Sequence, residues 1–177
     1  MKRNILLAAA VMLFAMAISA SAQKASDFSG TWTLDTAKSK PADAAVESQT
    51  LVVTQTAAEL KYERTTVRKA DADQGRGGRG MMGGGNATAS FSLDGKETVT
   101  EQEGRMGKIP VTNKAAVAGD GSVKLSSTRT FNGPQGEMSF TVNETWKLSA
   151  DGKTLTIERE TNSPRGASTS TSSYTKK

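Results

Sequence analysis

Four charged residues fall on the side of predicted β-strands that the alternation of apolar residues marks as buried. Arg64 shares its phase with Tyr62, and Arg129, Glu144 and Arg159 share theirs with the apolar residues of their own segments. A buried charge without a partner is costly. These side chains must therefore be paired, hydrated or close to strand ends.

Two interpretations of these residues stay open at the sequence level. In the first, Glu144 forms an internal ion pair with an arginine, or the charges sit at strand ends and reach solvent. In the second, Arg64, Arg129, Glu144, Arg159 and Tyr62 line a barrel cavity and hold the polar head of a small apolar ligand. An internal arginine would favour an anionic head group.

Catalytic and metal-dependent chemistry has little support in the composition. The chain has no histidine and no cysteine, which excludes Ser-His-Asp and Cys-His triads and the usual zinc, copper and nonhaem iron sites. It has no EF-hand pattern, and Glu144 has no visible second carboxylate to act with. We therefore expect no catalytic residues, no metal and no cofactor, and predict that the protein is not an enzyme.

The first 22 residues are typical of a cleavable secretory signal peptide. Lys2 and Arg3 precede an apolar run from Ile5 to Ile18, and Ala20-Ser21-Ala22 supplies a small-x-small cleavage pattern. The run is shorter than the roughly 20 residues needed to cross a bilayer. Because there is no cysteine to carry a lipid, we expect a periplasmic or secreted domain, 23–177, without stable membrane insertion.

Neither charge nor the glycine-rich segment favours nucleic acid. Without Lys2 and Arg3, 21 basic residues face 18 acidic ones, a mild excess spread along the chain. Segment 71–86 contains Arg76-Gly77-Gly78-Arg79-Gly80, which resembles an Arg-Gly-Gly box but has no interleaved aromatic residue. We interpret 71–86 as a disordered surface loop and expect no nucleic-acid partner.

Period-two alternation bounded by turn residues recurs along the mature chain and predicts an all-β fold. Asp-Gly pairs at 94–95, 120–121 and 151–152 are two-residue hairpin signals. Segment Thr36 to Ser48 is predicted as an irregular connection that could hold a short helix. About ten strands are expected, near residues 30–35, 49–56, 59–68, 87–93, 96–102, 109–118, 122–131, 137–149, 153–161 and 167–176.

Short sequential hairpins favour an antiparallel up-and-down meander that curls into a barrel and so removes its edges. The connections leave no room for crossover helices, so one domain of this kind is expected. Whether the barrel closes, stays half open or splits into two packed sheets is left open by the sequence.

The start of the mature chain resembles lipocalins, whose signature is matched by Gly30-x-Trp32. Together with Glu144 to Arg159, this start is similar to small exported bacterial lipocalin-like proteins that are mostly uncharacterised. The resemblance implies a calycin-type barrel in which Gly30 and Trp32 are structural and Trp32 closes one end. Ten strands are closer to fatty-acid-binding barrels, but Ser172-Ser173-Tyr174 replaces their Arg-x-Tyr, so no fatty-acid site carries over.

From this reasoning we expect a monomeric, exported, noncatalytic binding protein for a small, partly apolar and anionic ligand. The alternative is a structural or protein-interaction module of the cell envelope whose barrel is packed solid. A cavity inside the barrel would separate the two.

Overall fold

The computed structural model describes residues 24–41, 43–69, 86–104, 107–133, 136–164 and 166–177. Their regular secondary structure consists of antiparallel β-strands. None of them forms a helix that could cross a membrane. The ten strands are β1 (Gly30–Lys40), β2 (Val46–Gln55), β3 (Glu59–Arg68), β4 (Ala87–Ser92), β5 (Thr98–Gly104), β6 (Gly107–Val117), β7 (Val123–Gly133), β8 (Gly136–Leu148), β9 (Thr154–Ser163) and β10 (Gly166–Lys176).

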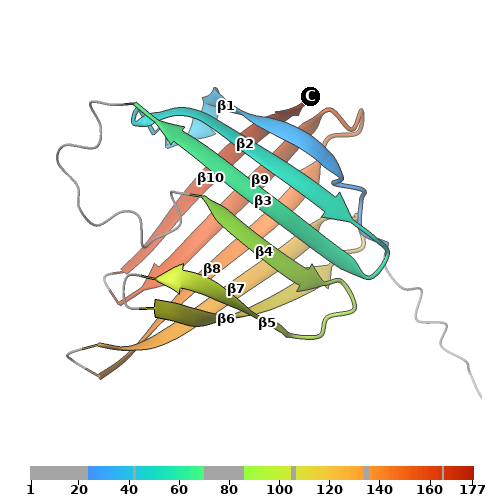
Figure 1. Cartoon of the computed structure of the whole chain (residues 1–177). Helices are drawn as coiled ribbons and strands as arrows, with labels where there is room; N and C mark the ends of the chain where they lie inside the picture. The colour runs from blue at the N-terminus through green and yellow to red at the C-terminus, as the bar shows by residue number, and fades with distance from the viewer. Residues whose placement is uncertain (1–23, 42, 70–85, 105–106, 134–135, 165) are drawn as a thin grey trace, which may run out of the picture.

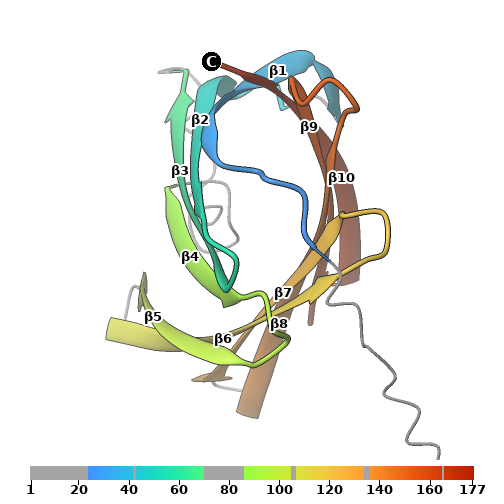
Figure 2. The same cartoon turned by 90° about the vertical axis from the view of Figure 1, so that its right-hand side faces the viewer.

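The strands form a single sheet in the order β4-β3-β2-β1-β10-β9-β8-β7-β6-β5. Every neighbouring pair is sequential except β1 with β10, which joins the two ends of the chain. The sheet curls into a barrel (Figures 1 and 2). The predicted ten-stranded meander is confirmed, and the described strands lie in one sheet rather than two.

The strands at the two ends of the sheet, β4 and β5, meet along a seam. No backbone ladder joins them among the described residues, because each pairs only with its other neighbour. The Thr98 hydroxyl donates a hydrogen bond of 3.0 Å to the Ser90 carbonyl oxygen across this seam. This bond spans the seam beside the β4–β5 turn, and the barrel is nearly closed rather than closed by a continuous ladder.

Two local expectations are wrong. Segment Thr36 to Ser48 contains no helix in its described part, because β1 continues to Lys40 through a bulge after Asp35 and pairs with β10 again. The Asp35 carboxylate accepts hydrogen bonds from the backbone N–H groups of Ala37 and Lys38, which satisfies the bulge locally.

The Asp-Gly hairpins lie where they were predicted, but none of the three has a two-residue turn. β4 ends at Ser92 and β5 begins at Thr98, β6 ends at Val117 and β7 begins at Val123, and β8 ends at Leu148 and β9 begins at Thr154. The Gly152 N–H donates to the Ser149 carbonyl, and the Ser149 N–H donates to the Thr154 carbonyl. A two-residue type I′ turn needs positive φ at both central positions. Here Gly152 has a φ of 69°, and positive φ among the described residues is confined to glycines.

One end of the barrel is closed by residues 24–29, which cross it before β1 begins (Figure 2). The Ser26 N–H donates to the Gly121 carbonyl in the β6–β7 turn. The Gln55 side chain donates to the Ser26 carbonyl and accepts from the Phe28 N–H. We call this the closed end. Trp32 is fully buried there and donates its indole N–H to the Phe28 carbonyl.

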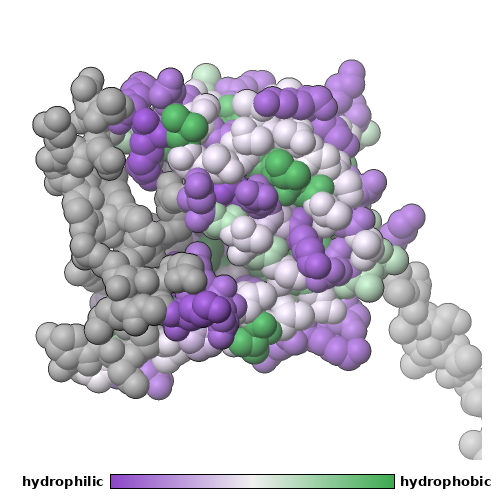
Figure 3. Space-filling model, viewed as in Figure 1, coloured by the Kyte–Doolittle hydropathy of each residue, from purple (hydrophilic) through white to green (hydrophobic). Residues whose placement is uncertain are grey.

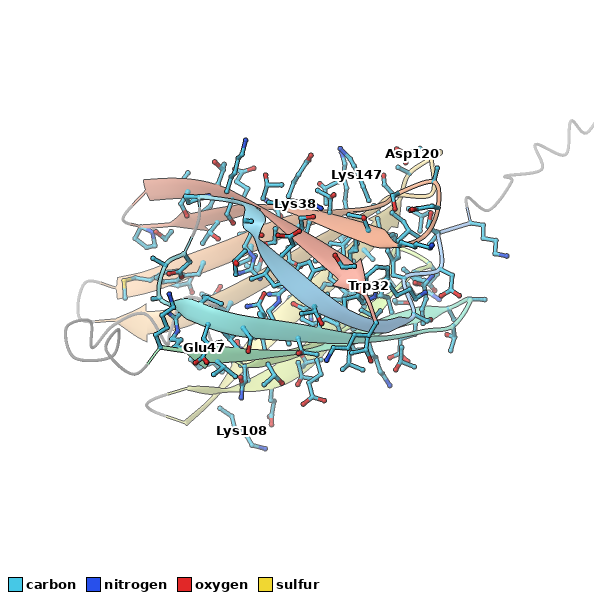
Figure 4. All side chains as sticks on the ribbon, turned by 90° about the horizontal axis from the view of Figure 1, so that it is seen from above. Trp32, Lys38, Glu47, Lys108, Asp120 and Lys147 are labelled. Atoms are coloured by element: carbon cyan, nitrogen blue, oxygen red, sulfur yellow. The ribbon has the colours of Figure 1, made fainter. Side chains whose placement is uncertain are left out.

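The apolar core fills the barrel from the closed end. Its largest fully buried side chains are Trp32, Trp146, Tyr174, Phe28, Phe91, Leu51, Leu60 and Leu155. Outward-facing side chains are mostly polar: Lys108 and Lys147 extend away from the wall on opposite sides (Figure 4), and the face over β2, β3 and β4 shows only small hydrophobic patches (Figure 3). The large apolar side chains are therefore gathered mainly inside the barrel.

We predict that Gly121→Ala destabilises the protein more than Gly152→Ala does. Both glycines have positive φ, 80° and 69°, where a side chain costs about 1–2 kcal/mol. A Cβ at Gly152 would meet nothing within 4 Å, whereas one at Gly121 would lie 2.6 Å from the Ser26 hydroxyl oxygen. Urea unfolding should show at least about 1 kcal/mol of extra loss for Gly121→Ala.

A Ser26→Gly background provides the control for this pair. Removing the hydroxyl should shrink the difference between the two variants, because the crowded atom is then gone. Equal losses for Gly121→Ala and Gly152→Ala would show that the Ser26 hydroxyl is not held against the β6–β7 turn.

Candidate ligand-binding site

Glu144 joins two arginines across the barrel interior. The Arg64 Nη2 atom lies 3.1 Å from Glu144 Oε1, and Arg159 Nε donates to the same oxygen at 2.8 Å. Arg159 also donates through Nη2. Arg64 and Glu144 are 3 % and 4 % exposed. We call this group, Arg64–Glu144–Arg159, the crossbar.

Two aromatic side chains, Trp146 and Tyr62, contact the crossbar. The Trp146 indole N–H donates to the second carboxylate oxygen of Glu144 at 2.9 Å. The Arg64 guanidinium lies over the Tyr62 ring, 5.1 Å from its centroid, where a cation–π contact is favourable. One donor is left over: the Nε of Arg64 is buried without a hydrogen-bond partner.

The pKa values follow from this geometry. Burial by itself would raise the pKa of Glu144, but Arg64 and Arg159 outweigh it and lower that pKa to about 2. Burial by itself would lower the pKa of Arg64, and Glu144 reverses this and raises it. Glu144 is therefore ionised at neutral pH and is a poor general base.

The crossbar divides the barrel interior because it connects β3 with the adjacent strands β8 and β9, which lie across the barrel from β3. The arc from β3 to β9 through β4–β8 encloses a smaller cavity of about 70 Å³. The opposite arc, through β2, β1 and β10, encloses a larger cavity of about 220 Å³. Arg64 and Arg159 line both cavities.

Arg129 reaches the smaller cavity from β7 and is balanced differently from the crossbar arginines. Its Nη1 donates to the neutral Gln102 side chain at 3.2 Å. It forms no ion pair with any residue whose side chain the structure describes. Burial, and then the charge of Arg159, lowers the pKa of Arg129. The smaller cavity thus carries three arginines against one carboxylate.

All five residues that the sequence singled out, Tyr62, Arg64, Arg129, Glu144 and Arg159, line the smaller cavity together. The internal ion pair of the first interpretation is also present, with two arginines rather than one. Their role in holding a ligand stays a prediction. Gly30 and Trp32 lie apart from them, at the closed end.

Sequence reasoning missed several polar lining residues. Asn113 is fully buried on β6 and bonds Thr100 and Ser127 across neighbouring strands. Its phase with Val111 and Ala115 could have identified it. Gln49 and Arg68 in the larger cavity could be placed only once the β1–β10 closure was known.

The described residues offer no group of three or more acidic side chains close enough to hold a metal ion. What the arrangement can do is bind: fixed positive charge and hydrogen-bond donors face a cavity with apolar walls. Such a surface complements an anion that carries an apolar part.

Comparison with known proteins adds little to this description. No family model and no curated protein matches the chain. Among solved structures, a zebrafish ileal bile acid-binding protein crystallised with cholic acid matches with a TM-score of 0.47 and 14% identity, over 86% of this chain and 100% of that one. The strand order of this chain, not this match, defines its fold.

We predict that Glu144→Gln costs about 3–5 kcal/mol of unfolding free energy at pH 7, because two buried arginines lose their counter-charge. The carboxylate's contribution is fully present above its unfolded pKa of about 4.5 and is lost as pH falls through about 2. In urea unfolding, the difference in unfolding free energy between wild type and Glu144→Gln should therefore become smaller as the pH falls from 5 to 2.

Glu137→Gln is the matched control, since Glu137 lies on the same strand and is exposed. It should change stability by less than about 0.5 kcal/mol. A gap for Glu144→Gln that stays constant down to pH 2 would contradict the crossbar's electrostatic role.

Proposed function

We propose that this protein is an exported, noncatalytic barrel that binds a small, partly apolar anion inside the smaller cavity. Arg129 and Arg159 would hold the anionic group, with Gln102 as a neutral partner. The crossbar would fix Arg159 in place through Glu144. The apolar part would rest on the cavity walls.

The observation that carries this proposal is the charge imbalance of the smaller cavity. The crossbar neutralises one of its two arginines, and Arg129 adds a further positive charge. A half-buried arginine beside another arginine is unfavourable without an anion. A bound carboxylate or sulfate would restore the balance with charge-assisted hydrogen bonds.

The cavity walls support the apolar half of the ligand. Phe91, Val111, Leu125 and Val142 line the same space as the arginines. Its volume of about 70 Å³ is several times the roughly 10–15 Å³ that one water needs, so the part bound there is small.

The second candidate is a structural or interaction module of the cell envelope. The solid packing at the closed end favours it, since Phe28, Trp32 and Trp146 leave no room for a ligand there. It predicts that no small anion binds. Native mass spectrometry of the protein from its exporting cells, with identification of any copurifying molecule, separates the two.

We predict that Arg129→Met weakens binding of short anionic amphiphiles such as hexanoate and hexyl sulfate at least about tenfold by calorimetry, from loss of a charge-assisted hydrogen bond. Stability should not fall, because burial and repulsion by Arg159 both disfavour the Arg129 charge. Lys114→Met, which removes an exposed charge from β6, is the control and should leave binding unchanged.

A loss of stability without a change in affinity would show that Arg129 is a structural residue. Absence of binding by wild type to every anion tested would favour the packed module instead.

Export is the remaining part of the proposal and is supported by residues 1–22 alone, which lie outside the described residues. We predict that the protein recovered from exporting cells begins at Gln23, as measured by intact mass. A mass that includes Met1 to Ala22 would contradict it. Ala22→Leu, which spoils the small-x-small pattern, should block processing.

A further inference from the structure

The larger cavity lies on the other side of the crossbar from the proposed anion site. Its walls come mainly from β1, β2, β9 and β10. At about 220 Å³ it is roomier than the smaller cavity, yet no sequence pattern pointed to it. The residues that line it differ from those of the smaller cavity in charge and in their polar groups.

Each of the three arginines that line the larger cavity, Arg64, Arg68 and Arg159, has a carboxylate partner. Arg68 lies 3.9 Å from the Asp43 carboxylate, and both line the cavity. Arg64 and Arg159 turn to Glu144 in the crossbar. The unbalanced Arg129 belongs to the smaller cavity alone. Unlike the smaller cavity, the larger one therefore has no arginine that lacks a carboxylate partner among the described residues.

Hydroxyl and amide groups dominate the polar part of the lining. The Tyr174 hydroxyl donates to Gln49 Oε1, whose amide nitrogen donates to the Thr66 hydroxyl at 2.7 Å. The Tyr174 hydroxyl hydrogen is therefore directed at Gln49, and Arg64 interacts with the Tyr174 oxygen. The hydroxyls of Ser170 and Ser172 form no hydrogen bond with the described residues.

The larger cavity is also lined by a buried hydrogen-bond donor and by apolar side chains. Arg64, whose Nε is buried without a partner, lines it. Leu34, Val46 and Ile157 provide apolar surface between the polar groups. A molecule with hydroxyls on its edge and C–H groups on its faces would satisfy both kinds of surface.

We propose that the larger cavity is a second binding site, for a small uncharged polyol such as a monosaccharide or an inositol. Ser170 and Ser172 bond its hydroxyls, and Leu34 and Ile157 contact its C–H faces. The site goes beyond the anion site, because each of its arginines already has a carboxylate partner and the crossbar separates the two cavities.

Ligand-observed NMR with a panel of neutral monosaccharides and myo-inositol tests this site. Ser172→Leu places an apolar side chain in the larger cavity, and Ala89→Leu is the matched substitution in the smaller one. At least one polyol should bind wild type and Ala89→Leu alike, and bind Ser172→Leu at least tenfold more weakly. Hexanoate binding should show the opposite pattern.

Thermal melting checks that each variant is folded, and Ser170→Val replaces Ser172→Leu where the latter is not. Hexanoate binding without any polyol binding would overturn the second site and leave the anion site standing. Polyol binding that Ala89→Leu abolishes would place the polyol in the smaller cavity and overturn the assignment. Binding of neither ligand would overturn both proposals.

Discussion

The structure depends on one constraint: a carboxylate buried in the middle of a barrel must be neutralised where it stands. Glu144 meets this constraint with Arg159 from the adjacent strand β9, with Arg64 from β3, and with the Trp146 indole on its own strand. Removing one partner would leave charge in a low-dielectric interior. The crossbar therefore sets which residues of β3, β8 and β9 lie at the same height, and it divides the space above the core.

Between the crossbar and the closed end, the barrel interior is a packed apolar core. Toward the opposite end, the interior is polar and contains the two cavities. At the closed end, residues 24–29 and the ring of Trp32 seal an aromatic core whose members are almost fully buried. Toward the opposite end the inward positions change to Gln, Ser, Asn and Arg, and both cavities lie among them. Polar interior positions weaken the core, so they are tolerated only because the sealed half supplies the hydrophobic stabilisation.

Alternation along single strands predicted most of this fold because burial on one face leaves a period of two in the sequence. The same signal placed Glu144 and Arg64 inside. It could not pair them, since 80 residues separate them and the pairing depends on barrel closure through β1 and β10. It also ended β1 too early, because the bulge after Asp35 interrupts the alternation while the strand continues. The larger cavity was missed because its lining comes from both ends of the chain, which meet only when β1 pairs with β10.

Arg129 separates a packed barrel from a binding barrel most clearly. Burial and its neighbour Arg159 both oppose its charge, and its hydrogen-bond partner, Gln102, is neutral. An apolar residue of similar length would pack beside Leu125 and Val142 without that penalty. A barrel whose interior served only stability gains nothing from this arginine. A barrel that receives an anion does, because the unfavourable charge of the empty cavity becomes the attraction that fills it.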